Sequence, residues 1–292
     1  MSSDSKLDRQ VLIAILAKDK QHCLPYYLDC IYNQKYPKSL IHIYIRTNNN
    51  KDRTTDILRR WLDIHGNEYA SVFFDHTNVD KKVEDYKPHD WNKTRFTILG
   101  KIRQDSITYA LNQNLDYFVV DCDNFISDIT LSNMSQANLP VVGPMLDLYC
   151  HPYSNFHLTV LETGYFKDSP EYQDVRWKRK IGIHKVDVIH CTYYIRHEYL
   201  KYVNYFDHGT ERHEYVIVSN NFRKAGIDQY VDNRHDYGVL TFQDDIDSLR
   251  KEPFYNRLNM DRSLEPYKDI MFDMLTKLVS RRKHSAILKS IS

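Results

Sequence analysis

The sequence predicts an α/β protein with a mostly parallel central sheet. Over the first 120 residues, short apolar runs alternate with segments of helical periodicity, an order typical of strands joined by helical crossovers. The run at 117–120 is short and continuously apolar, as expected for a strand that is buried on both faces. A chain of 292 residues is long enough for one such domain with a helical appendage.

The N-terminal half is expected to contain strands over 11–17, 41–46, 71–74 and 117–120. Helices are expected between them over 24–33, 54–65 and 95–114. The helix at 54–65 has the clearest pattern, because Ile57, Leu58, Trp61 and Leu62 share one face and Gly66 follows as a stop signal. The polar segment 75–93 is long enough to be a functional loop.

The C-terminal half is less regular. It predicts strands over 141–146, 183–190, 192–195 and 227–231, and a helix over 214–225 that ends at Gly226. Segment 268–288 carries a one-sided apolar stripe, which favours packing onto the domain or a homodimer through this helix. We therefore expect a polar tail (1–9), one α/β domain (10–245) and a helical C-terminal extension (246–292).

Composition excludes several functions. The 40 basic and 39 acidic residues give a net charge of +1, so no global field favours nucleic acid or a membrane surface. The five cysteines show neither C-x-x-C nor zinc spacing, and the first apolar run is too short for a membrane span. With no apolar signal region in the first ten residues, a reducing, cytoplasmic location is expected. No glycine-rich phosphate loop follows the first strand, which disfavours dinucleotide dehydrogenases, P-loop ATPases and nucleotidylyltransferases.

Two carboxylates follow the strand expected at 117–120. Asp121 and Asp123 stand on either side of Cys122, where ligands bind in open α/β sheets. Two acids at this spacing can hold a hard divalent cation between the protein and a diphosphate, although Asp also ends strands simply by forming turns. The pattern favours a nucleotide-sugar transferase.

Stretches spread over about 230 residues resemble the N-terminal glycosyltransferase module of the procollagen hydroxylysine galactosyltransferases. They are VLIAILAKD (11–19), YPKSLIHIYIRTNNNKDRTTDILRRWL (36–62), WNKTRF (91–96), KIRQ (101–104), DYFVVDCDNFI (116–126), GPMLD (143–147), YSNF (153–156), GYFKDSPEYQDVRWKR (164–179), VIHCTY (188–193), RKAGI (223–227) and NRHDYG (233–238). The resemblance implies a GT-A fold with a Rossmann-like sheet, a UDP-sugar donor, Mn²⁺, and a collagen or collagen-like acceptor that contains hydroxylysine.

The sequence departs from this family pattern in three ways. A secretory signal and a second glycosyltransferase module are not seen, which leaves the transferred sugar and its acceptor open. The family's Asn-Arg-Glu-His-Tyr-Gly is Asn-Arg-His-Asp-Tyr-Gly at 233–238, and the acidic pair that opens the late helix is His213-Glu214.

The resemblance strengthens the metal assignment. Asp123 is expected to bind Mn²⁺ (or Mg²⁺) directly and to take part in catalysis, while Asp121 reaches the metal or the ribose. The ion would neutralise the charge that builds on the departing UDP. His235 is the preferred further metal ligand, with Asp236 and His190 as alternatives.

Other residues are expected to contact the two substrates. Asn48 is placed to bind uracil, or is only a turn residue; Arg103 could bind uracil or phosphate. His190 could bind the donor sugar or fill the core. Glu214 is expected to receive the acceptor's proton, or to position the acceptor hydroxyl in a retaining mechanism, although a helix N-terminus favours an acid anyway.

Aromatic and acidic residues outside this set are candidates for acceptor binding. Trp91 and Trp177 could stack on a sugar or a triple-helical peptide, and Asp147 could meet a hydroxylysine ammonium. Two functions are therefore weighed. The first is a metal-dependent UDP-galactose or UDP-glucose transferase acting on hydroxylysine or galactosyl-hydroxylysine, and the second is a non-catalytic module that binds collagen or glycans on the same fold.

Overall fold

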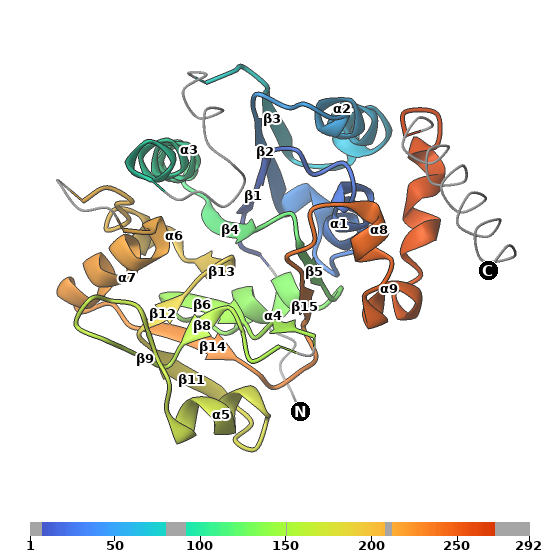
Figure 1. The fold of residues 1–292 in the computed structure, drawn as a ribbon. Helices are drawn as coiled ribbons and strands as arrows, with labels where there is room; N and C mark the ends of the chain where they lie inside the picture. Colours follow the sequence, from blue (N-terminus) through green and yellow to red (C-terminus); the bar gives the residue numbers. More distant parts are fainter. Residues whose placement is uncertain (1–7, 80–91, 150, 208–211, 272–292) are drawn as a thin grey trace, which may run out of the picture.

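The computed structural model describes residues 8–79, 92–149, 151–207 and 212–271. Its centre is an eight-stranded sheet in the order β11-β14-β6-β13-β4-β1-β2-β3 (Figure 1). The elements of the N-terminal half are β1 (Val11–Ala17), α1 (Leu24–Tyr32), η1 (Lys38–Leu40), β2 (Ile41–Thr47), α2 (Thr54–His65), η2 (Gly66–Glu68), β3 (Ser71–Asp75), α3 (Lys93–Asn112) and β4 (Asp116–Val120). Strands β4, β1, β2 and β3 are mutually parallel, which confirms the order predicted for this half.

The C-terminal half completes the sheet with shorter elements. They are β5 (Asn124–Ile126), α4 (Thr130–Gln136), β6 (Val141–Pro144), β7 (Asp147–Leu148), β8 (Phe156–His157), β9 (Thr159–Val160), β10 (Phe166–Lys167), α5 (Pro170–Arg176), β11 (Ile183–Val186), β12 (Val188–Ile189), β13 (Thr192–Ile195), α6 (His197–Leu200), α7 (Glu214–Lys224), β14 (Gln229–Asp232) and β15 (Gly238–Leu240). Strand β13 enters antiparallel between β4 and β6, while β14 pairs parallel with β6. A separate three-stranded sheet, β5-β15-β7, continues from the end of β4.

Two expected strands are wrong in extent. The strand expected over 183–190 is broken at Asp187, because β11 pairs with β14 whereas β12 pairs with β8. The Asp187 backbone amide donates to the carbonyl of His157, and its carboxylate accepts from the backbone amide of Val160, so the chain changes partner there. The strand expected over 141–146 ends at Pro144, and β7 joins the second sheet.

Helices cover both faces of the sheet, and the alternation of side chains along β1 separates two cores. Val11, Ile13 and Ile15 pack with the helices α1 and α2. Leu12 and Ala14 face the other core, which is shared with α3, α6 and α7 (Figure 1). Trp61 is 1 % exposed within the first core, as the helical pattern predicted.

The C-terminal extension packs on the α1 side of the domain. Its described part contains α8 (Ile246–Leu249), α9 (Pro253–Arg257) and the 3₁₀ segment η4 (Met260–Tyr267), whose apolar residues join the α1 core. Arg60 of α2 also pairs with Asp269 at 2.8 Å. Most of the helix expected over 268–288 lies outside the described residues, so the homodimer through it stays a prediction.

Candidate active site

The turn between β4 and β5 carries the acidic pair. The Asp121 backbone amide donates to the carbonyl of Cys191, and the Thr241 amide donates to the carbonyl of Asp123, both at 3.0 Å. Cys191 is held in the left-handed region at a φ of 63°, which turns the chain sharply into β13. The backbone of the acidic pair is therefore fixed by two segments distant in sequence.

Helix α1 and its N-cap residue Cys23 hold this turn and the end of β4 by hydrogen bonds. The Tyr27 hydroxyl donates to the carbonyl of Val120 at 2.9 Å, and Cys23 Sγ donates to the carbonyl of Cys122 at 3.3 Å. Cys122 itself is 2 % exposed and donates to the carbonyl of Leu16. Because Cys122 points into the core, the carboxylates on either side of it keep about a quarter of their surface exposed, 25 % for Asp121 and 27 % for Asp123.

Each carboxylate of the pair contacts a cationic side chain. Asp121 Oδ1 accepts from Arg103 Nη2 at 2.9 Å, and Asp123 Oδ2 accepts from Lys20 Nζ at 2.9 Å. Burial raises the pKa of Asp121, with Arg103 opposing the shift and Asp123 adding to it. The sequence predicted Arg103 for this site but missed Lys20, although Lys20 follows the carboxyl end of β1 just as Asn48 follows that of β2.

Glu214 joins the same network from the N-terminus of α7. Its Oε1 lies 3.3 Å from Arg103 Nε, and the two side chains are 9 % and 8 % exposed. Arg103 thus bridges Asp121 and Glu214. Glu214 Oε2 and Arg103 Nη1 are buried without a hydrogen-bond partner among the described residues. Native proteins seldom leave such atoms unpaired, so a water molecule, an ion or a polar ligand is expected to meet them.

A cluster of rings completes this side of the site. His190 is 2 % exposed and stacks on Tyr215 with 4.8 Å between the ring centroids. Its Nε2 has no hydrogen-bond partner within the described chain. Burial, assisted by His157 and Arg103, lowers the pKa of His190, so the ring is neutral. Its Nδ1 lies 2.9 Å from Cys191 Sγ, which leaves Nε2 for a ligand.

His157 is a member of this cluster that the sequence did not single out. Its ring centroid lies 5.3 Å from that of His190, and its Nδ1 is also buried without a partner among the described residues. Burial and the nearby Arg223 guanidinium lower the pKa of His157 to about 4. Its position directly after the family-like stretch YSNF was the available signal.

Asn48 is 7 % exposed directly after the end of β2. This placement agrees with a ligand-binding role, which stays a prediction.

The structure does not bring His235 to the acidic pair. Gly238 pairs with Ile126 and Leu240 with Asn124, so Asp123 lies beyond the Leu240 end of this ladder. His235 precedes Gly238 and lies at the opposite end, exposed, with its carbonyl accepting from Lys178 Nζ. Asp236 is exposed beside it. Either residue as a metal ligand is a prediction without a contact to support it.

The donor atoms of the pair suit a hard divalent cation, because both acids present carboxylate oxygens that water can reach. Within the described part of the chain, no group of three or more His, Cys, Asp or Glu side chains is gathered for a metal ion. Asp121 and Asp123 are therefore the carboxylates that this turn offers to a metal ion, and a nucleotide diphosphate could supply further ligands.

Of the residues expected to bind the acceptor, Trp177 and Asp147 belong to the described chain. Trp177 is 61 % exposed near the end of α5, and Trp91 lies outside the described residues. Asp147 pairs with Arg176 at 3.6 Å, and burial raises its pKa. Asp147 thus has a guanidinium beside it, and its contact with a hydroxylysine ammonium stays a prediction.

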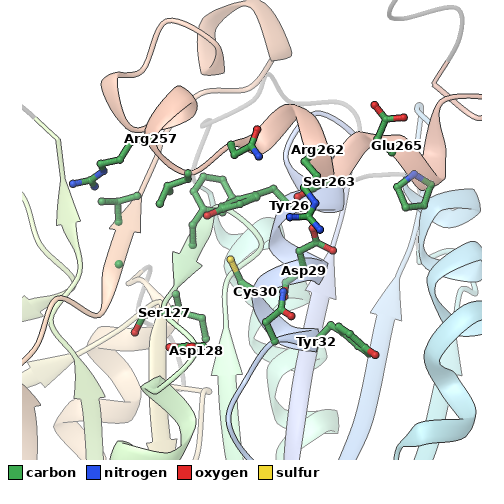
Figure 2. A pocket seen from close by; sticks show the side chains of 18 of the residues that line it. Tyr26, Asp29, Cys30, Tyr32, Ser127, Asp128, Arg257, Arg262, Ser263 and Glu265 are labelled. Carbon is green, nitrogen blue, oxygen red and sulfur yellow. The ribbon is translucent and has the colours of Figure 1, made fainter.

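A cavity of about 1000 Å³ lies apart from the acidic pair. Tyr26 and Asp29 of α1 face it, together with Arg257 and Arg262 of the C-terminal extension (Figure 2). Neither Asp121 nor Asp123 lines it. The cavity is therefore not the site defined by the unpaired polar atoms.

Solved structures identify the fold. The crystal structure of Staphylococcus aureus TarS matches 80 % of this chain and 36 % of its own, with 12 % identity and a TM-score of 0.50. Its fragment 1–349 matches 90 % of this chain and 72 % of its own, with 13 % identity and a TM-score of 0.50. The fold is that of the GT-A glycosyltransferases, as the sequence predicted.

The family follows from the sequence comparison. The family model for "Glycosyltransferase family 25, N-terminal domain" matches residues 8–252, so the chain belongs to this family. Mouse procollagen galactosyltransferase 2 is 31 % identical over 82 % of this chain and 41 % of its own length. Procollagen galactosyltransferase 1-A of Xenopus laevis is 31 % identical over 79 % and 39 %.

A third relative carries a different description. Human "Inactive glycosyltransferase 25 family member 3" is 31 % identical over 79 % of this chain and 40 % of its own length. The chain thus spans about 40 % of the length of these curated relatives. None of the described helices is long and apolar enough to cross a membrane.

Proposed function

We propose that this chain is a metal-dependent glycosyltransferase that moves galactose or glucose from a UDP-sugar to hydroxylysine or galactosyl-hydroxylysine of a collagen-like polypeptide. The observation that carries the proposal is the buried network of Asp121, Arg103 and Glu214 beside a neutral His190. Three of these four side chains present buried polar atoms that lack a partner among the described residues. A bound ligand with several hydroxyl or phosphate oxygens would satisfy them.

Relatives and structural neighbours support the substrate classes. Two curated relatives are named procollagen galactosyltransferases. TarS 1–349 has been crystallised with UDP, in a structure with a TM-score of 0.50 to this chain. These names support a collagen acceptor and a uridine nucleotide for this chain, whereas the choice between galactose and glucose depends on one hydroxyl orientation and stays open.

The residues have separable roles in this proposal. Asp123, with Asp121, would hold Mn²⁺ or Mg²⁺, which when bound supplies positive charge to the departing diphosphate. Asn48 binds the uracil, and His190 donates or accepts a hydrogen bond at the donor sugar through Nε2. Glu214, held by Arg103 at 3.3 Å, receives the proton of the acceptor hydroxyl or orients that hydroxyl.

A non-catalytic binding module is the second candidate. A relative at similar identity is named inactive. In addition, both acids of the pair already contact a protein cation, although Arg103 is shared with Glu214. A module of this kind would bind the glycosylated acceptor without turning over a donor.

UDP release distinguishes the two functions. The assay uses Mn²⁺ and compares UDP-galactose with UDP-glucose on deglycosylated and on galactosylated collagen peptide. Release that depends on the peptide, and that is lost in Asp123→Ala, is expected for one donor and acceptor combination. Peptide binding without UDP release in all four combinations would establish the second candidate instead.

A further inference from the structure

Lys20 lies where a cation bound to Asp123 would lie. Its Nζ is 2.9 Å from Asp123 Oδ2, and the two side chains are only 23 % and 27 % exposed. The Lys20 ammonium is thus a positive charge placed directly at this acid.

The backbone of Lys20 is fixed in place. Its amide donates to Thr54 Oγ1 of α2 at 2.7 Å, and its carbonyl accepts from the Leu24 amide at 2.9 Å in the first turn of α1. Asp19, which precedes it, donates its amide to Asn50 Oδ1 at 2.9 Å. The ammonium is therefore presented by a loop tied to α1, α2 and the end of β2, and not by a free surface chain.

Lys20 offsets the charge of Asp123. Each carboxylate of the pair has one cationic partner at 2.9 Å, but Arg103 also pairs with Glu214, so Asp121 and Glu214 share one cation. A divalent ion attracted to Asp123 must displace the ammonium or share the carboxylate with it. The same ammonium lies at the carboxyl end of the sheet, where it can also contact an anionic diphosphate.

We propose that Lys20 is a counter-ion that competes with a divalent metal ion for Asp123 and binds part of the nucleotide diphosphate. Binding of the donor then depends less on the metal ion. The nucleotide half of this statement rests on the proposed function, whereas the competition for Asp123 does not. Neither half requires the protein to turn over a substrate, so both can be tested by binding.

Two binding measurements test the proposal with the full chain. Mn²⁺ affinity is measured without nucleotide by electron paramagnetic resonance, for the wild type, Lys20→Met and the control Lys18→Met. Lys18 belongs to the same loop but forms no ion pair with either acid in the described structure. UDP affinity is then measured for the same proteins in EDTA by calorimetry, and thermal melting verifies that each variant is folded.

Removing the ammonium should have opposite effects on the two ligands. Lys20→Met should bind Mn²⁺ about 10-fold more tightly than wild type, a change of about 1.4 kcal/mol. Its affinity for UDP in EDTA should fall about 10-fold or more, while Lys18→Met changes neither value by more than about 2-fold.

The outcomes separate this inference from the proposed function. Equal Mn²⁺ affinity in Lys20→Met and wild type, including undetectable binding in both, overturns the competition. Unchanged metal-free UDP affinity in Lys20→Met overturns the diphosphate contact. If no protein binds UDP with or without Mn²⁺, the proposed function fails, and the Mn²⁺ comparison still decides the competition.

Discussion

Arg103 should be the residue whose loss destabilises the candidate site most. Its guanidinium bridges Asp121 Oδ1 at 2.9 Å and Glu214 Oε1 at 3.3 Å from a side chain that is 8 % exposed. Arg103→Met keeps most of the aliphatic stem but removes the charge. In this variant no cation lies between the carboxylates of Asp121 and Glu214.

The magnitude follows from how deeply each acid is buried. Removing one partner of a buried ion pair typically costs about 3 to 5 kcal/mol, because the remaining charge is uncompensated. Glu214 is 9 % exposed and should carry most of this cost. Asp121 is 25 % exposed, so water screens it and its share should be below about 1 kcal/mol. We therefore expect Arg103→Met to lose about 3 to 4 kcal/mol of unfolding free energy.

Urea denaturation at pH 7 measures this loss by linear extrapolation. Adding Glu214→Gln removes the stranded charge, so the double variant should recover about 2 kcal/mol relative to Arg103→Met. Arg179→Met is the matched control, because Arg179 pairs with Asp174 at the surface and should cost less than about 1 kcal/mol. A loss below 1 kcal/mol for Arg103→Met, or full additivity in the double variant, would refute the bridging role.

Three further predictions concern catalysis and pH. Asp123→Ala should lower turnover at least about 100-fold with little change in melting temperature, and normal turnover would remove its metal role. Glu214→Gln should lower turnover about 100-fold while UDP affinity is retained, and an unchanged rate would exclude it as the base. The pKa of His157 is about 4 in the folded state and 6.5 in the unfolded state. Its contribution to the free energy of unfolding is therefore present above pH 6.5 and is lost as pH falls towards 4. Between pH 7 and pH 5, the wild type should lose about 2 kcal/mol of unfolding free energy from this group, measured by urea denaturation. His157→Gln should lose correspondingly less, whereas the exposed control His151→Gln should lose as much as wild type.

The N-terminal half of the fold could be predicted because its signals are local. Strand β1 and residues 117–120 of β4 are continuous apolar runs, β2 has isoleucine at every second position, and α2 shows one apolar face from Ile57 to Trp61. Such patterns need no knowledge of tertiary partners. The predicted helix over 54–65 agrees with α2 at both ends.

The break between β11 and β12 was not predictable in the same way. Residues 183–190 form one continuous run with strand propensity, but two different partner strands divide it. The division depends on contacts of Asp187 with a segment almost 30 residues away in sequence. Pairing choices at this range are absent from local periodicity.

The acidic pair was chosen from its place directly after a strand. Arg103 contacts Asp121 and Glu214 joins them from α7, and the roles assigned to these residues stay predictions. His235 was chosen by its position in a family-like motif, and the ladder between β5 and β15 carries it away from Asp123. Lys20 was missed because a lysine after a strand is common on protein surfaces, and only its contact with Asp123 distinguishes it.

A crystal of this chain soaked with UDP and excess Mn²⁺ tests the central claim most directly, through the anomalous signal of the metal. We expect a manganese peak within bonding distance of an Asp123 carboxylate oxygen, with the diphosphate of UDP on its other side and uracil near Asn48. A nucleotide bound elsewhere, or a metal peak remote from both acids, would contradict the account.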